Sequence, residues 1–160
     1  MPTYRILLAM LAFILAGCTP DQEHDSDAVL LGVFRRERPV FDQLVRMIEE
    51  DKGLERVDYD WTMPDPSPVS EARLAKYREL LRKVGCVRGF ENFTGKDEVL
   101  FIASANGMAT GGSSKGYCYT RKTPSPLVKD LDEYRPGHTR TYAAFRHIEG
   151  DWYLIYEYDD

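Results

Sequence analysis

The chain has 160 residues, with 21 Lys and Arg against 26 Asp and Glu and a formal net charge of −5. This length fits a short leader followed by one ordinary domain, and it excludes a second large core. The mild acidity argues against general nucleic-acid binding, because proteins with that function present a basic face to the phosphates.

Residues 1–17 have the pattern of a secretory signal. One basic residue, Arg5, precedes an unbroken apolar run at positions 6–16. An apolar run of about 7–15 residues behind a basic start is typical of an export signal. It is shorter than the roughly 20 residues that span a bilayer. We expect this segment to be removed, the alternative being an uncleaved apolar helix followed by an incidental cysteine.

The residues Leu15-Ala16-Gly17-Cys18 resemble the lipobox of bacterial lipoproteins. Two small side chains stand before a cysteine, as the signal peptidase of that family requires. The resemblance implies that a diacylglyceryl group is attached to the Cys18 sulfur, that the peptidase cuts before Cys18, and that a fatty chain such as palmitate acylates the new amino group. Two or more chains anchor a protein stably in a membrane, whereas one chain binds only marginally.

The residue after the cysteine carries a sorting signal in Gram-negative members of that family. An Asp there often retains the protein at the inner membrane, and this chain has Thr19 instead. The resemblance therefore implies the periplasmic face of the outer membrane.

Residues 18–27 are polar and acidic and have no apolar period. We interpret them as a lipidated flexible tether, followed by one globular domain at residues 28–160. His24 lies in this tether among acidic residues. A metal role for it is conceivable, and we favour a solvated tether histidine.

The domain begins with a first helical pattern. Residues 28–34 are apolar and fit either a strand or the lead-in to a helix. Pro39 suits a first helical turn, and Gly53 suits the end of the helix. Between them an apolar stripe has helical spacing. Its members are Phe41, Leu44, Val45 and Ile48.

A connection at residues 54–69 separates this helix from the next. It holds a short extended piece at residues 56–61, and three prolines exclude a helix through its end. We expect Trp61 and Met63 to pin the connection to the core.

The second helix is predicted from about Ser70 to Val84. Ser67 or Ser70 can cap its N-terminus, and Gly85 can end it. Its basic face is interpreted as a solvated helix surface.

After Cys86 the apolar period changes from 3.6 to 2. Strands are predicted at residues 98–104, 108–119, 139–148 and 152–158, with a turn at Asn106-Gly107, a glycine-rich interruption at 111–116 and a helical turn near 127–134. Four such strands form an antiparallel β-meander. Two α-helices packed on one face of it make an α+β fold.

Two cysteines remain after Cys18. Cys86 and Cys118 form an even pair in an exported domain, which predicts a disulfide bond. The alternative is two separate buried thiols. Neither cysteine has a Cys or His at ligand spacing, so we expect no metal site, and no motif indicates a cofactor.

The segment Gly111-Gly112-Ser113-Ser114-Lys115 is the candidate binding loop. Gly107 and Gly112 have phosphate-loop spacing, but serines stand where that motif needs Lys followed by Ser or Thr. No helix N-terminus follows to hold a phosphate. We therefore reject nucleotide binding and expect a glycine-rich loop or bulge that can approach a partner closely.

Ser114 is also the centre of a Gly-x-Ser-x-Gly pentapeptide. With an acid such as Asp130, and with His138 or His147, it would have the chain order of a hydrolase triad. The residues after Ser114 have the pattern of a strand, where the nucleophile elbow requires a helix. A serine hydrolase is therefore the alternative function.

Together these patterns predict a membrane-anchored periplasmic lipoprotein without catalytic activity. Its domain is expected to bind a periplasmic protein, one specific form being an immunity or inhibitor protein against a toxin or hydrolase. A structural envelope component is a further alternative. We expect no cofactor, no metal and no nucleic-acid partner.

Overall fold

The computed structural model describes residues 24–92, 97–108, 111–134 and 140–160. The predicted signal peptide, Cys18, Thr19 and the first part of the tether lie outside these ranges, as does His138. The elements in chain order are α1 (Asp27–Glu50), β1 (Arg56–Val57), β2 (Thr62–Met63), α2 (Glu71–Lys83), β3 (Phe90–Glu91), β4 (Glu98–Met108), β5 (Gly111–Thr120), β6 (Thr141–Glu149) and β7 (Trp152–Asp159).

The described residues confirm the α+β class. They form two helices and one seven-stranded sheet with the order β2-β1-β3-β4-β5-β7-β6, in which every neighbouring pair is antiparallel. The four predicted strands correspond to β4, β5, β6 and β7. The extended piece predicted at residues 56–61 contains β1, whereas β2 and β3 are not predicted, because two residues are too few to show a period of 2.

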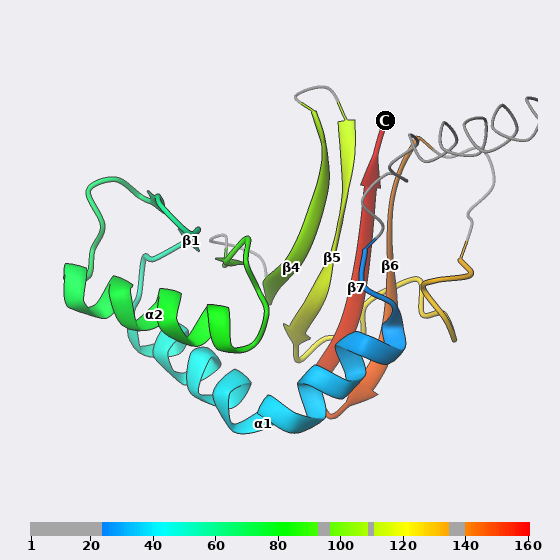
Figure 1. Ribbon diagram of the computed structural model, residues 1–160, viewed down its shortest axis with the longest axis horizontal. Coiled ribbons are helices and arrows are strands. Elements are labelled where there is room, and N and C mark those ends of the chain that lie inside the picture. Colours follow the sequence, from blue (N-terminus) through cyan, green and yellow to red (C-terminus); the bar gives the residue numbers. More distant parts are fainter. Residues whose placement is uncertain (1–23, 93–96, 109–110, 135–139) are drawn as a thin grey trace, which may run out of the picture.

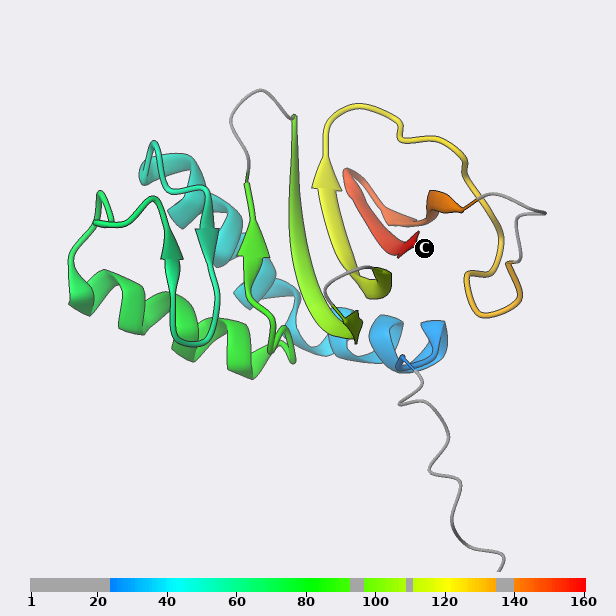
Figure 2. The same cartoon turned by 90° about the horizontal axis from the view of Figure 1, so that it is seen from above.

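Both helices lie on the same face of the sheet (Figures 1 and 2). One core cluster joins them to side chains of the central strands. Its centre is aromatic: the Phe41 ring lies 4.6 Å from that of Tyr117 and 5.4 Å from that of Trp152. Phe34 lies 5.3 Å from both Phe41 and Trp152. These contacts fix α1 against β5 and β7.

Helix α1 is longer than predicted and contains a kink. It begins at Asp27, where the Ser26 side chain accepts a hydrogen bond from the Val29 N–H. Glu37 has non-helical angles (φ −107°, ψ 18°) two residues before Pro39. Proline lacks the N–H of a helical hydrogen bond, and its ring crowds the preceding turn. The predicted helix is the half after this kink, and residues 28–34 belong to the half before it.

Helix α2 agrees closely with its prediction. The Ser70 side chain accepts a hydrogen bond from the Arg73 N–H, and Val84 is the C-terminal cap. Gly85 follows with a φ of +72°, a conformation that glycine adopts without the steric cost of a Cβ atom. The local signals in the sequence were therefore sufficient for this element.

The glycine-rich segment is a strand, not the loop that we expected. Strand β5 is continuous through Gly116, and the irregularity in pairing lies in β4 between Ile102 and Ser104. A Cβ atom on Gly116 would lie 2.0 Å from the Phe101 carbonyl oxygen, and one on Gly112 would lie 2.5 Å from that of Asn106. The glycines therefore allow β4 and β5 to approach closely.

The predicted disulfide is not present, and Cys86 and Cys118 are free buried thiols. Cys86 belongs to the core on the helical side of the sheet, whereas Cys118 belongs to a separate cluster with Leu100 and Tyr153. Burial raises the pKa of both thiols, that of Cys118 to about 12. The alternative of two separate thiols is the correct one.

The helical turn predicted near residues 127–134 is also wrong. The segment forms bends, and Leu127 pairs with Phe145 of β6 in an isolated parallel bridge. The Val128 N–H donates to the Phe145 carbonyl oxygen of β6, and the N–H groups of residues 131–133 donate to the carboxylates of Asp27 and Asp130. These backbone groups are therefore satisfied without a helix.

Candidate functional site

The residues of the candidate binding loop point to both faces of the sheet, because successive side chains alternate along a strand. Ser113 and Lys115 lie on the helical side, where they contact His24 and Asp27 respectively. The Ser114 hydroxyl contacts Glu157 instead. Only part of this segment can therefore face any one ligand.

His24 is part of the folded body. Its Nδ1 atom lies 2.6 Å from the Ser104 hydroxyl and its Nε2 atom 2.8 Å from the Ser113 hydroxyl. The ring meets Tyr156 edge-on at 5.5 Å. Burial, followed by the positive charge of Lys115, lowers the pKa of His24 below 6.5. The interpretation of His24 as a solvated tether residue was wrong, since no local pattern indicates contacts so distant in the sequence.

Asp27 is the centre of a buried ionic network. Lys115 Nζ and Arg146 Nη1 each lie 2.8 Å from one of its carboxylate oxygens, and the Leu131 N–H donates to it at 2.9 Å. Burial alone would raise the pKa of Asp27, but the hydrogen bonds from Lys115, Arg146 and Leu131 outweigh burial and lower it. The network ties the start of α1 to β5, β6 and the loop around residue 131.

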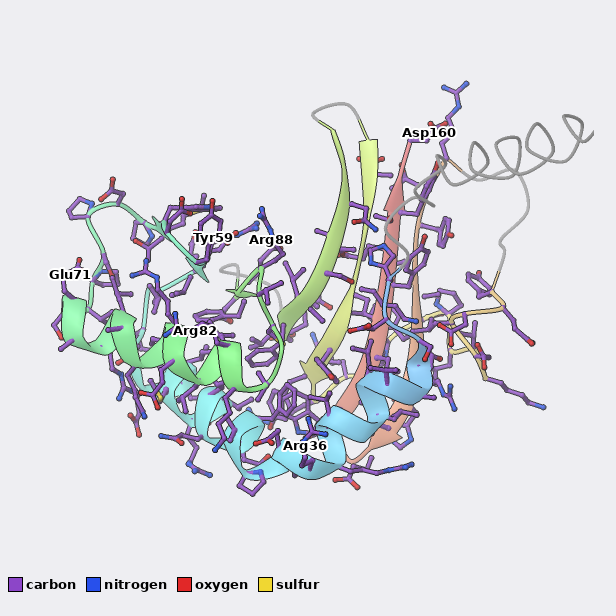
Figure 3. All side chains as sticks on the ribbon, in the orientation of Figure 1. Arg36, Tyr59, Glu71, Arg82, Arg88 and Asp160 are labelled. Atoms are coloured by element: carbon purple, nitrogen blue, oxygen red, sulfur yellow. The ribbon has the colours of Figure 1, made fainter. Side chains whose placement is uncertain are left out.

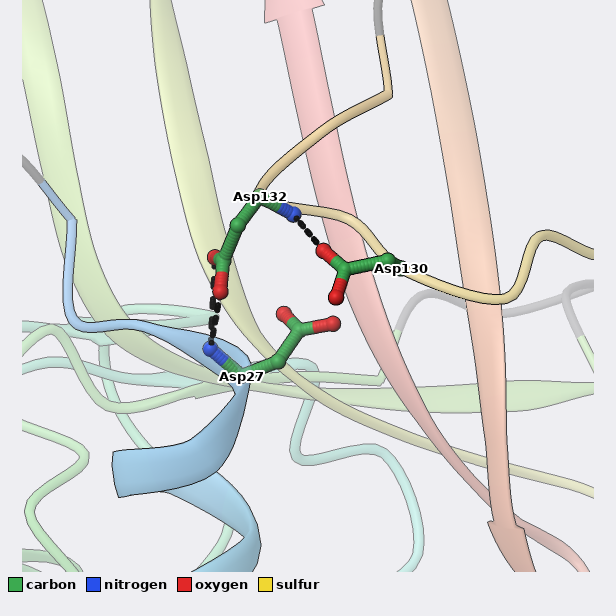
Figure 4. Close-up of side chains that lie close together, drawn as sticks. All are labelled: Asp27, Asp130 and Asp132. Atoms are coloured by element: carbon green, nitrogen blue, oxygen red, sulfur yellow. Dashed lines mark hydrogen bonds between the residues drawn. The ribbon is translucent and has the colours of Figure 1, made fainter.

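Three carboxylates meet at this network, as Figure 4 shows. One carboxylate oxygen from each of Asp27, Asp130 and Asp132 lies within 4.8 Å of the other two. The Asp27 N–H donates to the Asp132 carboxylate, and the Asp132 N–H to Asp130. Lys115 and Arg146 supply positive charge within the same network. We therefore interpret the three acids as a structural clamp.

The structure does not bring the candidate hydrolase triad together among the residues it describes. Ser114 pairs with Glu157 of β7, whereas His147 pairs with Tyr153. Four residues along a strand correspond to about 13 Å. The His147 ring meets the Gly150 carbonyl oxygen at 3.1 Å. These positions place His147 away from Ser114, and the other candidate base, His138, lies outside the described residues.

A cleft of about 980 Å³ lies between the short strands β1 and β3 and the free ends of the long strands. Arg56, Arg88 and Glu91 line one wall, and the other wall comes from the free ends of β4 to β7. Figure 1 shows the short strands around β1 standing opposite β4 and β5. Gly111, Gly112, Ser113 and Ser114 line this second wall. The candidate binding segment thus borders a hollow, although it is not a loop.

The β1–β2 hairpin exposes three large apolar side chains beside this cleft. Tyr59 is 63 % exposed, Trp61 40 % and Met63 39 %. The expectation that Trp61 and Met63 are pinned to the core was therefore wrong. Val57 and Asp58 are the fully buried residues of the hairpin. A hairpin with strands of two residues can bury little else.

Arginines stack on the exposed rings. The Arg56 guanidinium lies 4.7 Å from the Trp61 ring centroid, and that of Arg88 lies 5.9 Å from the centroid of Tyr59. The buried Asp58 carboxylate holds this arrangement, with Arg56 at 3.2 Å and Arg88 at 3.8 Å. We call residues 56–63 together with residues 86–91 the arm, whose Tyr59 and Arg88 are labelled in Figure 3.

Residues 56–61 are predicted to be extended, but they are not among the predicted site residues. A signal was present: Tyr59 and Trp61 alternate with acids in a segment whose apolar residues are few. The pairing of β1 with β3 decides which side of the hairpin is buried. This pairing involves only two residues of each strand. That pairing has no sequence signature of its own.

Comparison with known proteins finds no matching family model, no matching curated protein and no matching solved structure. Within the described part of the chain, neither helix is sufficiently long and apolar to cross a membrane.

Proposed function

We propose that this protein is a lipid-anchored, non-catalytic binding module of the bacterial envelope, and that the arm is its protein-binding surface. The observation that carries the proposal is the exposure of Tyr59, Trp61 and Met63 next to stacked arginines at the edge of a cleft. The lipobox resemblance supplies the address, with Cys18 as the lipidated residue.

The composition of the arm supports protein binding. Trp, Tyr and Arg are the residue types most enriched among the side chains that dominate binding energy in interfaces. A stacked arginine loses less side-chain freedom on binding than a free one, which lowers the entropic cost of association. The adjacent cleft offers a concave surface in which a projecting partner residue loses contact with water.

The specific form that we propose is an immunity or inhibitor protein at the periplasmic face of the outer membrane. A lipid anchor retains such a protein where an incoming toxin or hydrolase arrives. Binding to an incoming protein requires an exposed recognition surface and no catalytic group. The arm meets the first requirement.

Lipidation is tested by growing cells with radioactive palmitate and by measuring the mass of the purified protein. We expect label in the wild type, none in Cys18→Ser, and a mature mass without residues 1–17. An intact leader with an unmodified Cys18 contradicts the proposed address.

Binding is tested by quantitative mass spectrometry of proteins that copurify with the chain from cell envelopes. We expect Trp61→Ala to lower recovery of a specific partner at least about tenfold, the effect of losing a dominant interface side chain. Leu127→Ala is the matched control, since Leu127 is 49 % exposed on the opposite edge of the sheet. Equal losses in both variants contradict the assignment to the arm. Fluorophosphonate labelling that Ser114→Ala abolishes contradicts the non-catalytic proposal.

A further inference from the structure

We propose that the arm, with the neighbouring end of α2, recognises an acidic segment of its protein partner. In this inference, which rests on the proposed function, Arg78, Arg82 and Arg88 bind carboxylates while Tyr59 provides the apolar contact. The proposed function gives the location of the binding surface, and this inference gives the chemistry of the partner that the surface recognises.

The three arginines gather around one aromatic ring. Arg78 and Arg82 are one turn apart on α2, and both line a small hollow of about 40 Å³ together with Tyr59 and Val87. The Arg78 Nε–H donates to the Asp58 carbonyl oxygen at 3.1 Å, which holds its guanidinium at the hairpin. Figure 3 shows Arg82 between α2 and the hairpin, and Arg88 beside Tyr59.

These arginines have little negative charge to neutralise them. Among the residues that the structure describes, no carboxylate lies within 4.0 Å of the guanidinium of Arg78 or Arg82, and Arg88 meets only Asp58, at 3.8 Å. By contrast, Arg73 on the same helix pairs with Glu50 and Asp51 at 2.9 and 2.6 Å.

Local acids reduce this positive charge without cancelling it. Asp58, which is fully buried, meets both Arg56 and Arg88, and Glu91 also pairs with Arg56. These two acids offset the charges of Arg56 and Arg88 and leave those of Arg78 and Arg82. Asp60 in the hairpin turn is exposed and opposes one arginine charge. The surface therefore keeps a positive balance in a chain whose net charge is −5. Complementary charge both speeds encounter with a partner and rejects partners of like charge.

Carboxylates are the anions that these side chains fit best in a protein partner. The guanidinium group is planar and binds a carboxylate through two parallel hydrogen bonds. Tyr59 and Val87 are 63 % and 56 % exposed, so apolar area lies directly between the charges. An acidic segment that also carries aromatic or aliphatic side chains would satisfy both parts of the surface.

The shape of the region favours a protein segment over an anionic membrane. Arg88 also lines the cleft of about 980 Å³, whose opposite wall is formed by the free ends of the long strands. A flat layer of lipid headgroups cannot enter such a hollow, whereas a peptide can. Membrane-binding polybasic patches also use clusters of about four to eight Lys and Arg on an accessible surface.

The test is selection of random dodecapeptides on phage against the full-length lipoprotein in nonionic detergent, followed by fluorescence anisotropy of the enriched peptides. We expect sequences rich in Asp and Glu with interspersed aromatic residues. The double variant Arg82→Glu/Arg88→Glu should weaken their binding at least about tenfold, and binding should weaken as salt increases. Arg35→Glu is the control, because Arg35 is exposed on α1 and undergoes the same change of charge.

Three results overturn the inference. In the first, the enriched peptides have no acidic bias but still bind less well to Trp61→Ala. This result refutes recognition of an acidic segment and leaves the arm as a binding surface. Peptides whose binding is unaffected by Arg82→Glu/Arg88→Glu and by Trp61→Ala contradict the proposed function as well. The third result is that the protein binds vesicles with anionic lipids and not acidic peptides, and that Arg82→Glu/Arg88→Glu loses the vesicle binding. The arginines would then bind a membrane surface.

Discussion

Asp27 fixes the start of α1 against the sheet. Its carboxylate is buried under α1 and faces two cations from different strands, Lys115 and Arg146. The predicted tether ended at this residue, yet Asp27 is the first residue of α1. One aspartate in an acidic stretch gives no indication of such long-range pairing. The predicted boundary between tether and domain, at residue 28, therefore lies too late in the chain.

We predict that Asp27→Asn lowers the free energy of unfolding by about 3 kcal/mol, because it removes the buried negative charge that Lys115 and Arg146 share and leaves Lys115 only the part-exposed Asp132. Urea unfolding of the two proteins at pH 7.5 measures the difference. Asp60→Asn changes the same functional group at an exposed position and should stay within about 0.5 kcal/mol of the wild type. Similar values for both variants would refute the structural role of the network.

His24 should make stability depend on pH. Its pKa is lower in the folded protein than the ordinary value of 6.5, owing to burial and to Lys115. The unfolded chain therefore binds the proton more tightly, so the contribution of His24 is present above pH 6.5 and is lost as the pH falls through the folded pKa. We expect His24→Ala to lower the free energy of unfolding by about 1 kcal/mol at pH 7.5.

At pH 5 the difference between wild type and His24→Ala should be smaller than at pH 7.5. Urea unfolding at the two pH values provides both numbers, and the comparison between the two proteins cancels the other titrating groups. A difference that grows on acidification contradicts the assigned direction of the pKa.

At the scale of elements, glycine positions decide how β4 and β5 pair. Gly116 has no space for a side chain, whereas a Cβ atom on Gly32 in α1 would contact nothing within 4 Å. The sequence shows only that glycines cluster at 111–116. Their role in close strand pairing depends on which backbone atoms of β4 lie opposite.

We predict opposite effects for the same substitution at these two positions. Gly116→Ala should lower the free energy of unfolding by about 3 kcal/mol or more, since its methyl group would overlap the Phe101 carbonyl. Gly32→Ala should raise it by about 0.5–1 kcal/mol, because alanine has the higher helix propensity. Thermal unfolding of both variants measures the shifts, and a tolerated Gly116→Ala would refute the close pairing.

Elements with local signals were predictable and those without them were not. Helix α2 has a cap, an apolar stripe and a terminal glycine within 16 residues of sequence, and its prediction is confirmed. The long strands show a period of 2 and were also found. The sequence indicates an extended piece that contains β1, but strands β2 and β3 depend on their pairing with β1 and β4 and have no local pattern of their own.

At the scale of the whole molecule, the arm and the start of the body have different positions in the fold. The predicted lipid site, Cys18, precedes His24 by six residues, which extend to at most about 20 Å. His24 lies against β4 and β5, whereas the arm contains β1, β2 and β3. In the function that we propose, the anchor therefore holds the body close to the membrane while the arm is formed by separate elements.

The candidate site could be predicted from the sequence only in part. The glycine-rich segment does border the cleft, but Trp61 and Met63, which are exposed beside the cleft, were expected in the core. Trp and Tyr are favourable in cores and in interfaces alike, so composition alone does not decide between the two. The pairing of β1 with β2 and β3 decides whether Trp61 is buried or exposed.

The most direct test of the arm as a binding surface is photo-crosslinking in living cells. A benzophenone amino acid replaces Trp61 in one strain and Leu127 in another. Both positions are exposed, and they lie at opposite edges of the sheet. We predict that illumination links position 61, and not position 127, to one envelope or incoming protein. No adduct at position 61, or the same adducts at both positions, would contradict the account.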